Sequence, residues 1–133
     1  MKLVLGLGCD RNAPLSTLEA AIDKALASAQ LNRDQVVQLA SIDKKQDELA
    51  LLQLGQLYHW PIQFYPAEQL AAVIVPSPSA VVLKYMGTPS VSEAAAILAA
   101  NTDMSDLLVE KYKYCGKEGK NATVSIVRMR VNT

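Results

Sequence analysis

An apolar stretch, a glycine-rich run and a helix start follow one another at the N-terminus, and this order constrains the fold most. Residues 3–5 (LVL) lead into residues 6–11 (GLGCDR), and Ser16 with Glu19 has the spacing of a capping box, which starts a helix. A strand, a glycine turn and a helix N-terminus in this order commonly build an anion or ligand site. We therefore predict a ligand loop within an α/β fold.

This loop lacks the pattern of a dinucleotide-binding loop. That pattern would need a third glycine at position 11, where helix and strand approach each other closely. The chain has Arg11 there, and a long cationic side chain does not fit such a contact. The prediction is therefore a loop for another kind of ligand.

Apolar runs and amphipathic patterns alternate through the first two thirds of the chain. Strands are predicted at 3–7, 36–41 and 62–65, and helices at 17–29, 44–58, 66–70 and 91–100. The stretch 79–86 fits either a strand or a helix capped by Ser79, and we favour the helix. Further capping-box spacings occur at Asp43 with Gln46 and at Ser90 with Glu93. In the helix 44–58, the residues expected to be buried include Leu49, Leu52 and Leu57.

The C-terminal third has a different pattern. Strands are predicted at 108–114 and 122–130, and Gly116, Gly119 and Asn121 favour a turn between them. Such a hairpin would add an antiparallel pair to a mostly parallel sheet. We therefore expect one domain over residues 1–133. Its fold would be a three-layer α/β/α arrangement with a mostly parallel mixed sheet that ends in a C-terminal antiparallel hairpin.

Charge and composition argue against several classes of protein. The 133 residues include 13 Lys or Arg and 13 Asp or Glu, so the formal net charge is zero and there is no basic excess of the kind typical of nucleic-acid binders. No apolar run reaches the roughly 18 residues that a membrane span needs. No signal peptide is visible either, so a cytoplasmic location is expected. A net charge near zero offers little repulsion between copies, which leaves a homo-oligomer as an open prediction.

Metal and cofactor chemistry are not predicted. The chain has one histidine, His59, and two distant cysteines, Cys9 and Cys115, which do not form a zinc-binding pattern. His59 is expected at the edge opposite the ligand loop, which argues against a Ser-His-Asp triad. No catalytic residue is assigned, and no cofactor is expected.

Three loops are candidates for one shared ligand site. Loops that leave the carboxyl ends of parallel strands gather at one edge of a sheet, and each helix N-terminus there offers free N–H groups and about half a positive charge. This arrangement suits a ligand with several carboxylates or phosphates. The candidate ligand-binding residues are Gly8, Cys9, Arg11, Ser41, Asp43, Lys45, Glu48, Thr88, Ser90 and Glu93.

Several of these candidates also have a purely structural interpretation. Arg11 either binds a ligand carboxylate through its planar guanidinium or ties down its own loop through Asp10 or Asp43. Lys45 is either a ligand-binding cation in the first turn of a helix, where a positive charge is unfavourable, or a solvated side chain. Glu48, one helical turn further on, would form a surface ion pair with Lys45.

The remaining candidates have similar alternatives. Cys9 is either a reactive thiol, with a pKa lowered by the nearby helix N-terminus, or a small buried residue. Ser90 and Glu93 are expected to cap a helix, with a ligand contact by Thr88 or neighbouring amides as an addition. For a hydrolytic activity, Cys9, Asp43 and Glu48 would be the candidates, but no complete pair of base and nucleophile is visible.

Three strings of the sequence resemble the CobE family of cobalamin biosynthesis, which is also the C-terminal domain of CbiG. They are GLGCDR at 6–11, ASIDKKQDE at 40–48 and GTPSVSEAAA at 87–96. Lys111 and the strand ATVSIVR at 122–128 are similar too, so the resemblance covers nearly the whole chain. It implies a three-layer α/β fold with a mixed sheet.

The resemblance also implies a role in building the corrin ring. Longer CbiG relatives are associated with opening the δ-lactone of cobalt-precorrin-5A with loss of acetaldehyde, and this chain resembles the stand-alone form. We therefore predict binding of a precorrin-type tetrapyrrole, whose acetate and propionate side chains match an anion-binding edge. The alternatives are a hydrolase or hydrolase subunit acting on that lactone, an interaction partner of another cobalamin-pathway enzyme, and a phosphate or nucleotide binder.

Overall fold

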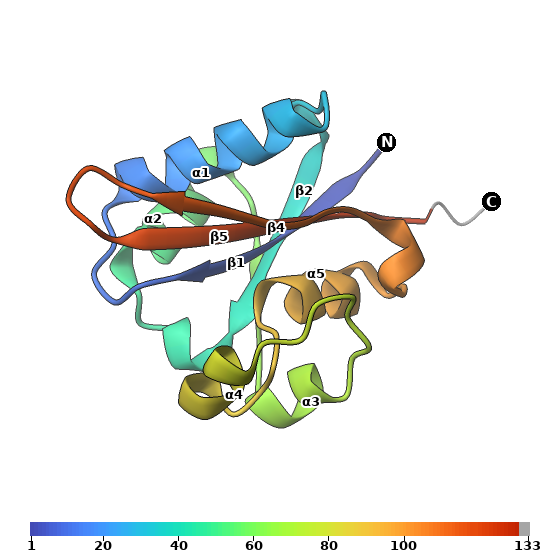
Figure 1. Ribbon diagram of the computed structural model, residues 1–133. Coiled ribbons are helices and arrows are strands. Elements are labelled where there is room, and N and C mark those ends of the chain that lie inside the picture. The colour runs from blue at the N-terminus through green and yellow to red at the C-terminus, as the bar shows by residue number, and fades with distance from the viewer. Residues whose placement is uncertain (131–133) are drawn as a thin grey trace.

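The computed structural model describes residues 1–130, in which a five-stranded sheet lies between two layers of helices (Figure 1). The order across the sheet is β3-β2-β1-β5-β4, so β1 occupies the middle. The strands are β1 (Leu3–Cys9), β2 (Val36–Ile42), β3 (Ile62–Tyr65), β4 (Leu107–Cys115) and β5 (Asn121–Arg128).

The strand directions confirm the predicted mixed sheet. β1 pairs with β2, and β2 with β3, in parallel, whereas β5 is antiparallel to both β1 and β4. The hairpin of β4 and β5 therefore places its second strand against β1 and leaves β4 at the edge of the sheet. Because β1 and β2 run in the same direction, the loops that follow them meet at one edge.

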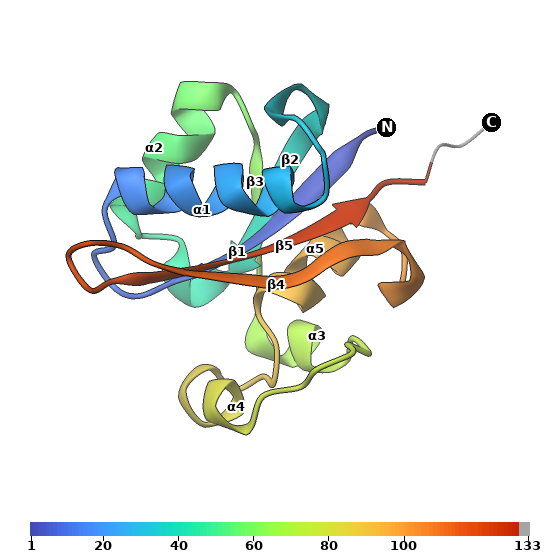
Figure 2. The same ribbon diagram turned by 45° about the horizontal axis from the view of Figure 1, so that its top comes forward.

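Helices cover both faces of the sheet, as the two views in Figures 1 and 2 show. α1 and α2 lie on one face, and α3, α4 and α5 lie on the other, so the predicted three-layer arrangement is confirmed. The helices are α1 (Leu15–Ser28), α2 (Leu49–Tyr58), α3 (Ala67–Ala71), α4 (Ala80–Met86) and α5 (Ser92–Ala100). Short 3-10 turns occur at Arg33–Gln35, Asp43–Lys45 and Met104–Asp106.

The side chains of β1 alternate between the two faces of the sheet. Leu3, Leu5 and Leu7 are fully buried in the cluster that packs with α1 and α2. Val4 belongs to the second cluster, formed with α5 and α3 on the other face. The apolar stretch of the sequence thus serves two separate cores.

Gly6 faces α5, and its lack of a side chain lets this helix approach closely. A Cβ atom at this position would lie 1.7 Å from the backbone oxygen of Ser92, in the first turn of α5. Ser92 Oγ also accepts a hydrogen bond from Ser125 Oγ on β5 (2.8 Å), and Ser125 is the register partner of Gly6. The start of α5 is therefore fixed directly over the middle of the sheet.

The predicted helix over 44–58 is wrong at its start and in its buried face. Asp43–Lys45 forms a 3-10 turn, and α2 begins only at Leu49. Leu49, Leu52 and Leu57 are exposed, and other apolar residues of α2 face the sheet instead. The sequence of α2 is apolar on most sides, so a leucine pattern does not identify the side that packs. The buried residues of α2 are Ala50, Leu51 and Leu54.

The predicted capping boxes do not form at any of the three places. α1 begins directly after Pro14, so that Ser16 lies inside the helix, and neither the Asp43–Lys45 turn nor α5 has a side-chain cap. In α5, the Glu93 carboxylate forms an ion pair with Lys111 instead. Ser79, by contrast, caps α4 as predicted, because its Oγ accepts a hydrogen bond from the Val82 N–H (3.2 Å).

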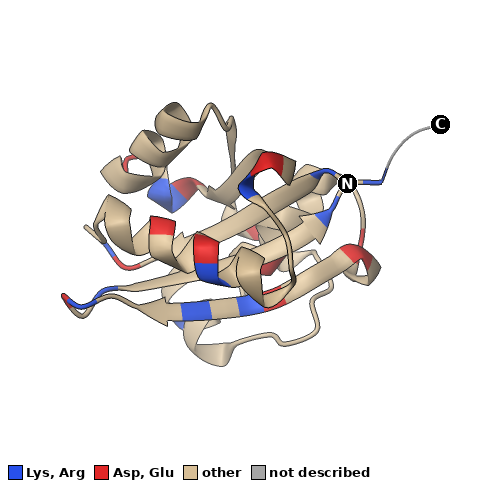
Figure 3. Cartoon of the chain, turned by 90° about the horizontal axis from the view of Figure 1, so that it is seen from above, with Lys and Arg blue, Asp and Glu red and all other residues tan. Residues whose placement is uncertain are grey.

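Lys and Arg residues lie among Asp and Glu residues along the elements seen in Figure 3. Between residues 1 and 130, no helix has the length and apolar character needed to cross a membrane.

We expect Gly6→Ala to destabilise the protein strongly, because the added methyl group would overlap the backbone oxygen of Ser92, which no rotamer change can move away. The expected loss in the free energy of unfolding is about 3 kcal/mol, as for severe overpacking. Urea denaturation followed by circular dichroism measures this loss. Gly8→Ala is the matched control, since the nearest atom to a Cβ there lies 3.9 Å away in Thr123. Equal stability of the two variants would contradict the role of Gly6.

Candidate functional site

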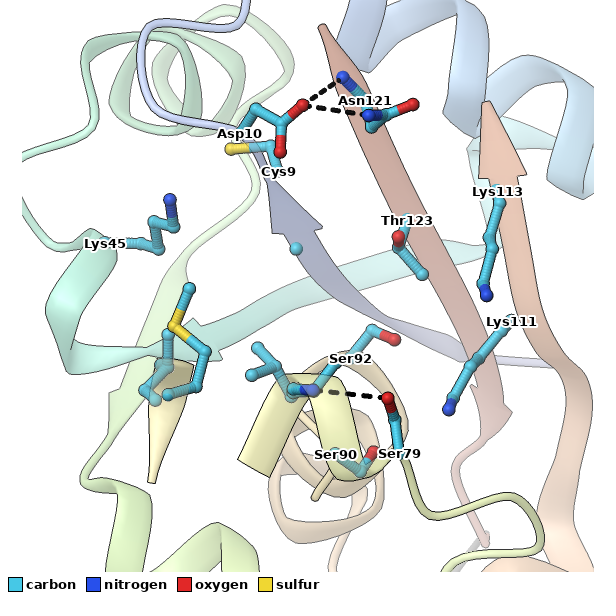
Figure 4. Close-up of a pocket in the computed structure, with 15 residues that line it drawn as sticks. Cys9, Asp10, Lys45, Ser79, Ser90, Ser92, Lys111, Lys113, Asn121 and Thr123 are labelled. Carbon is cyan, nitrogen blue, oxygen red and sulfur yellow. Dashed lines mark hydrogen bonds between the residues drawn. The ribbon is translucent and has the colours of Figure 1, made fainter. Parts of the chain in front are cut away.

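A pocket of about 190 Å³ lies at the edge of the sheet where β1 and β2 end (Figure 4). The end of β1 with its loop (8–10) and the 3-10 turn after β2 form part of the wall. The residues that begin α5 (90–92), one side of α4 and the β4–β5 hairpin complete it. Segments from the N-terminal half, the middle and the C-terminal third of the chain thus meet at one site.

One row of residues across the sheet forms a continuous part of this wall. Gly8 on β1 is paired with Thr123 on β5, and Thr123 is paired with Lys113 on β4. All three residues line the pocket. Because Gly8 has no side chain, the space above β1 stays open next to the Thr123 hydroxyl and the Lys113 ammonium.

Hydrogen bonds join the loop after β1 to the hairpin. Asp10 Oδ2 accepts one bond from the Asn121 backbone N–H (2.8 Å) and another from Asn121 Nδ2 (3.0 Å). The Asp10 N–H in turn donates to the Asn121 carbonyl (2.9 Å). The one carboxylate on the pocket wall therefore already has partners within the chain, and its negative charge is directed at the hairpin.

α4 forms another wall of the pocket. Val82 and Met86, one helical turn apart, both line it. Lys111 Nζ donates a hydrogen bond to the Ser77 carbonyl just before the helix (2.6 Å). Gly87 ends the helix with a φ of 77°, in the left-handed region that favours glycine. These contacts place an apolar helix face next to the lysines of the hairpin.

Three lysines, Lys45, Lys111 and Lys113, give the pocket a positive charge. Lys45 is only 5% exposed, and no carboxylate among residues 1–130 lies within 4.0 Å of its ammonium. Lys113 likewise has no ion pair within the described part of the chain. Lys111 is different, because its Nζ lies 3.4 Å from Oε1 of Glu93. Two of the three cations thus remain available to an anion.

Glu93 lies behind the pocket wall and is fully buried in the first turn of α5. Its Oε2 has no hydrogen-bond partner among the described residues. Burial raises the pKa of Glu93, and the nearby Lys111 opposes this shift. Glu93 therefore holds Lys111 in place through this ion pair and does not cap α5.

Arg11 is not part of the pocket wall, because contacts within the chain hold its guanidinium. Nη1 lies 2.9 Å from Asp47 Oδ1 and 2.6 Å from Glu48 Oε2, and Nη2 donates to the Lys44 carbonyl (3.0 Å). The contact with Glu48 Oε2 is an ion pair that lies outside hydrogen-bond geometry. Glu48 Oε1 accepts a bond from the Asn12 N–H (2.6 Å). Together these contacts join the loops after β1 and β2.

The structure therefore corrects three interpretations of charged residues. Arg11 ties down its own loop through Asp47 and Glu48, and not through Asp10 or Asp43. Glu48 is 2% exposed and pairs with Arg11, so its assignment to a surface ion pair with Lys45 is wrong. Lys45 is neither solvated nor in the first turn of an α-helix, because it is buried in a 3-10 turn.

Cys9 lines the pocket, but its thiol is not activated. Burial raises the pKa of Cys9 to about 11, even though Lys45 nearby lowers it. The prediction of a lowered pKa is therefore wrong. At neutral pH the thiol stays protonated, and a protonated thiol is a poor nucleophile.

The other predicted residues have mixed positions. Ser41 is buried and its Oγ donates to the Leu7 carbonyl (2.7 Å), and the buried Thr88 Oγ1 donates to the Ser90 carbonyl (3.0 Å). Asp43 begins the 3-10 turn and does not line the pocket. In the described residues, no three His, Cys, Asp or Glu side chains group so as to hold a metal ion. The predicted residues that do line the pocket are Gly8, Cys9, Lys45 and Ser90.

The hairpin contributes pocket residues that were not assigned to the site from the sequence. Lys111 and Lys113 on β4, and Thr123 on β5, all line it. Lys111 and Lys113 are two residues apart in a predicted strand, which places them on the same side of it. This spacing indicates a pair of cations on one face of the strand. It does not show that the carboxyl end of β1 lies beside them, because that depends on how the hairpin pairs with the sheet.

Comparison with known proteins relates this chain and its fold to cobalamin synthesis. The family model for the cobalamin synthesis G C-terminus matches residues 3–127. Cobalt-precorrin-5A hydrolase from Priestia megaterium is 33% identical over 124 residues, which are 93% of this chain but only 31% of that protein. Protein CobE from Sinorhizobium sp is 36% identical over 111 residues, which are 82% of this chain and 71% of that protein.

A solved structure agrees with the sequence relationships. The crystal structure of CobE, a protein from the cobalamin (vitamin B12) biosynthetic pathway, matches with a TM-score of 0.74 and 28% sequence identity, and the match covers 98% of this chain and 93% of that one. The molecule is thus a three-layer α/β protein with a cationic pocket at the ends of its parallel strands. The chain belongs to the cobalamin synthesis G C-terminus family. The resemblance identified from three short strings is confirmed.

We expect Cys9 to react with iodoacetamide much more slowly than the exposed Cys115 at pH 7–8, since a pKa of about 11 leaves little thiolate. The thiolate fraction of Cys9 grows about tenfold for each pH unit below its pKa, so its rate should still rise between pH 9 and 10. Mass spectrometry of a proteolytic digest measures both rates in one sample. A Cys9 rate that reaches its plateau below pH 8 would show that the thiol is activated.

We expect Arg11→Met to reduce stability, because it leaves the buried Glu48 carboxylate without its cation. The loss in the free energy of unfolding should exceed that of an exposed control, because Glu48 is 2% exposed and a buried charge without a partner is costly. Arg33→Met is the control, because it removes an ion pair with the exposed Asp23 and a hydrogen bond to the Tyr58 hydroxyl (2.8 Å) but leaves no buried carboxylate without a partner. If Arg11→Met lowers the free energy of unfolding no more than the control does in urea denaturation, Arg11 does not stabilise the contact between the two loops.

Proposed function

We propose that this chain binds a precorrin-type tetrapyrrole during cobalamin synthesis, with one carboxylate side chain of the ligand in the lysine-lined pocket. The observation that carries the proposal is the buried Lys45 ammonium, which has no anionic partner among residues 1–130. The similarity to cobalt-precorrin-5A hydrolase from Priestia megaterium and to CobE supports the pathway.

The charge of the pocket favours an anionic ligand. Burial of a charge is costly unless the charge is paired, and a ligand carboxylate between Lys45 and Lys113 would supply the missing partner. Carboxylates accept charge-assisted hydrogen bonds from ammonium groups, and these bonds are about twice as strong as neutral ones. Lys111 would contribute less, because Glu93 already balances its charge.

The size of the pocket indicates which part of the ligand enters it. Its volume of about 190 Å³ lies below the roughly 300–1,000 Å³ of pockets that enclose a drug-sized molecule. It would accept an acetate or propionate side chain, but not a macrocycle. Ile42, Val82 and Met86 provide apolar wall for the methylene groups of such a side chain.

Binding fits the site better than catalysis does. The Cys9 thiol is protonated at neutral pH, and the carboxylate beside it on the pocket wall, Asp10, is already hydrogen-bonded to Asn121. A hydrolase, or a hydrolase subunit, acting on the δ-lactone of cobalt-precorrin-5A is the second candidate, because the Priestia megaterium relative carries that name. Release of acetaldehyde from cobalt-precorrin-5A by the purified chain would favour this second function.

An interaction with another cobalamin-pathway enzyme is the third candidate. The chain spans only 31% of the length of the Priestia megaterium hydrolase. A separate protein equivalent to the remaining part of that hydrolase would be the matching partner. Such a partner is compatible with the pocket, since it would bring a tetrapyrrole to the same edge of the sheet.

We expect Lys45→Met and Lys113→Met each to weaken binding of hydrogenobyrinic acid about tenfold or more, because each removes a charged hydrogen bond to the ligand of about 1.5–3 kcal/mol. Fluorescence quenching or calorimetric titration measures the affinity. Lys24→Met on α1, across the sheet from the pocket, removes the same charge and should leave the affinity within about twofold. Wild-type affinity in both pocket variants, or an equal loss in the control, would refute the pocket as the binding site.

A further inference from the structure

α5 begins without a cap from its own chain. Val91 occupies the N-cap position and provides no side-chain hydrogen bond, because valine has no acceptor. The N–H groups of Ser92, Glu93 and Ala94, in the first turn, cannot be paired within the helix. All three residues are buried, and a buried N–H group without a partner costs free energy. An acceptor supplied by a ligand would remove that cost.

α5 runs antiparallel to β1, so its N-terminus points to the carboxyl end of that strand. Gly6, in the middle of β1, lies against the Ser92 carbonyl. Val4, near the start of β1, belongs to the same apolar cluster as Ile97, which lies further along the helix. Because the N–H groups of the first turn point out of the N-terminal end of a helix, those of α5 are directed toward Gly8.

Gly8 leaves open the space toward which α5 points. It is the next residue of β1 on the same face as Gly6, about 7 Å further along the strand. The nearest atom to a Cβ at Gly8 would lie 3.9 Å away in Thr123, so no side chain crowds this part of the strand. Gly8, Ser92 and Lys45 all line the pocket. The uncapped end of α5 and the buried lysine therefore face one shared space.

Two positive groups border this space. The N-terminal end of a helix carries about half a positive charge. Lys45 carries a full charge, is only 5% exposed, and has no carboxylate of residues 1–130 within 4.0 Å. The carboxylate of Asp10, on the pocket wall, is hydrogen-bonded to Asn121 instead. Figure 4 shows Lys45 and Ser92 on different sides of the pocket, so that one anion between them would pair with both.

We propose that the carboxylate of the ligand caps α5, accepting hydrogen bonds from the N–H groups of residues 92–94 and from the Lys45 ammonium above Gly8. This inference rests on the proposed function and states how the pocket holds the carboxylate. The ligand takes the place of the Asp, Asn, Ser or Thr side chain that commonly caps a helix. Free N–H groups and the helix dipole make a helix N-terminus a suitable site for such an anion.

This cap selects a carboxylate over a carboxamide of the same shape. Its groups, the first-turn amides and the Lys45 ammonium, are all hydrogen-bond donors. Both oxygens of a carboxylate accept such bonds, and the negative charge strengthens them. The NH2 group of a carboxamide would instead lie against another donor. A ligand whose side chain is amidated therefore loses this contact.

The test follows the backbone amide signals of the isotope-labelled protein by two-dimensional NMR during a titration with sodium acetate at constant ionic strength. Acetamide, which has the same shape without the charge, is the matched ligand. The first turn of α2, residues 49–51, is the control within the protein, because it also lacks a side-chain cap but does not line the pocket.

We expect the signals of residues 92–94 to shift with acetate and to reach a plateau, while those of residues 49–51 stay in place. Acetamide at the same concentrations should leave both sets of signals unchanged. The cap is overturned if the signals of residues 92–94 do not move with acetate, or if they move equally with acetamide.

A variant tests whether Lys45 and α5 hold the same anion. In Lys45→Met, the acetate concentration at the midpoint of the shifts should rise at least tenfold, because a hydrogen bond to a charged group is lost. Lys24→Met on α1, across the sheet from the pocket, should keep the midpoint within about twofold of wild type. An unchanged midpoint in Lys45→Met would mean that the lysine and the helix do not share an anion, and the proposal would then be wrong.

A titration with hydrogenobyrinic acid separates this inference from the proposed function. Corrin binding that depends on Lys45 and Lys113, but leaves the signals of residues 92–94 in place, overturns the cap alone and leaves the proposed function standing. If the wild-type protein does not bind the corrin, the proposed function is wrong, and the cap, which concerns the carboxylate of that ligand, is overturned with it.

Discussion

The contact between Gly6 and the first turn of α5 determines how the rest of this structure is arranged. The Ser92 carbonyl occupies the space that a side chain at position 6 would need. Because of this approach, α5 starts directly above the middle strand, and residues 90–92 reach the ends of β1 and β2. If a side chain at position 6 pushed α5 away from the sheet, residues 90–92 would no longer form this wall of the pocket.

β1 combines two functions through the alternation of its side chains. Its leucines pack into the core with α1 and α2, while Val4, Gly6 and Gly8 follow one another on the α5 side. On that side Val4 packs in the core, Gly6 contacts α5 and Gly8 lines the pocket. The end of the glycine-rich run, Gly8 and Cys9, lines the pocket. However, the glycines lie within the strand and act through the absence of side chains, and not through a turn.

Local patterns predicted the elements well, because strand and helix periodicities depend on neighbouring residues. The mixed sheet, the hairpin and the Ser79 cap follow from such patterns. The buried side of α2 does not, because its sequence is apolar almost all round. Other contacts join residues that are far apart along the chain. Arg11 pairs with Glu48. Lys113 reaches the pocket only because β4 pairs with β5 and β5 pairs with β1. Such contacts depend on the assembled fold.

The two groups of charges near the end of β1 have different tasks, and their surroundings explain why. Arg11 contacts two carboxylates and a carbonyl, so its charge serves to join two loops. Lys45, only 5% exposed in the adjacent turn, has no such partner in the described residues. Stability alone would favour a paired or solvent-exposed cation at this position, since an unpaired buried charge is costly. This cost agrees with the proposed function, in which an anionic ligand would be the partner of Lys45. The chain has zero net charge, and its pocket is nevertheless positive because three lysines line it.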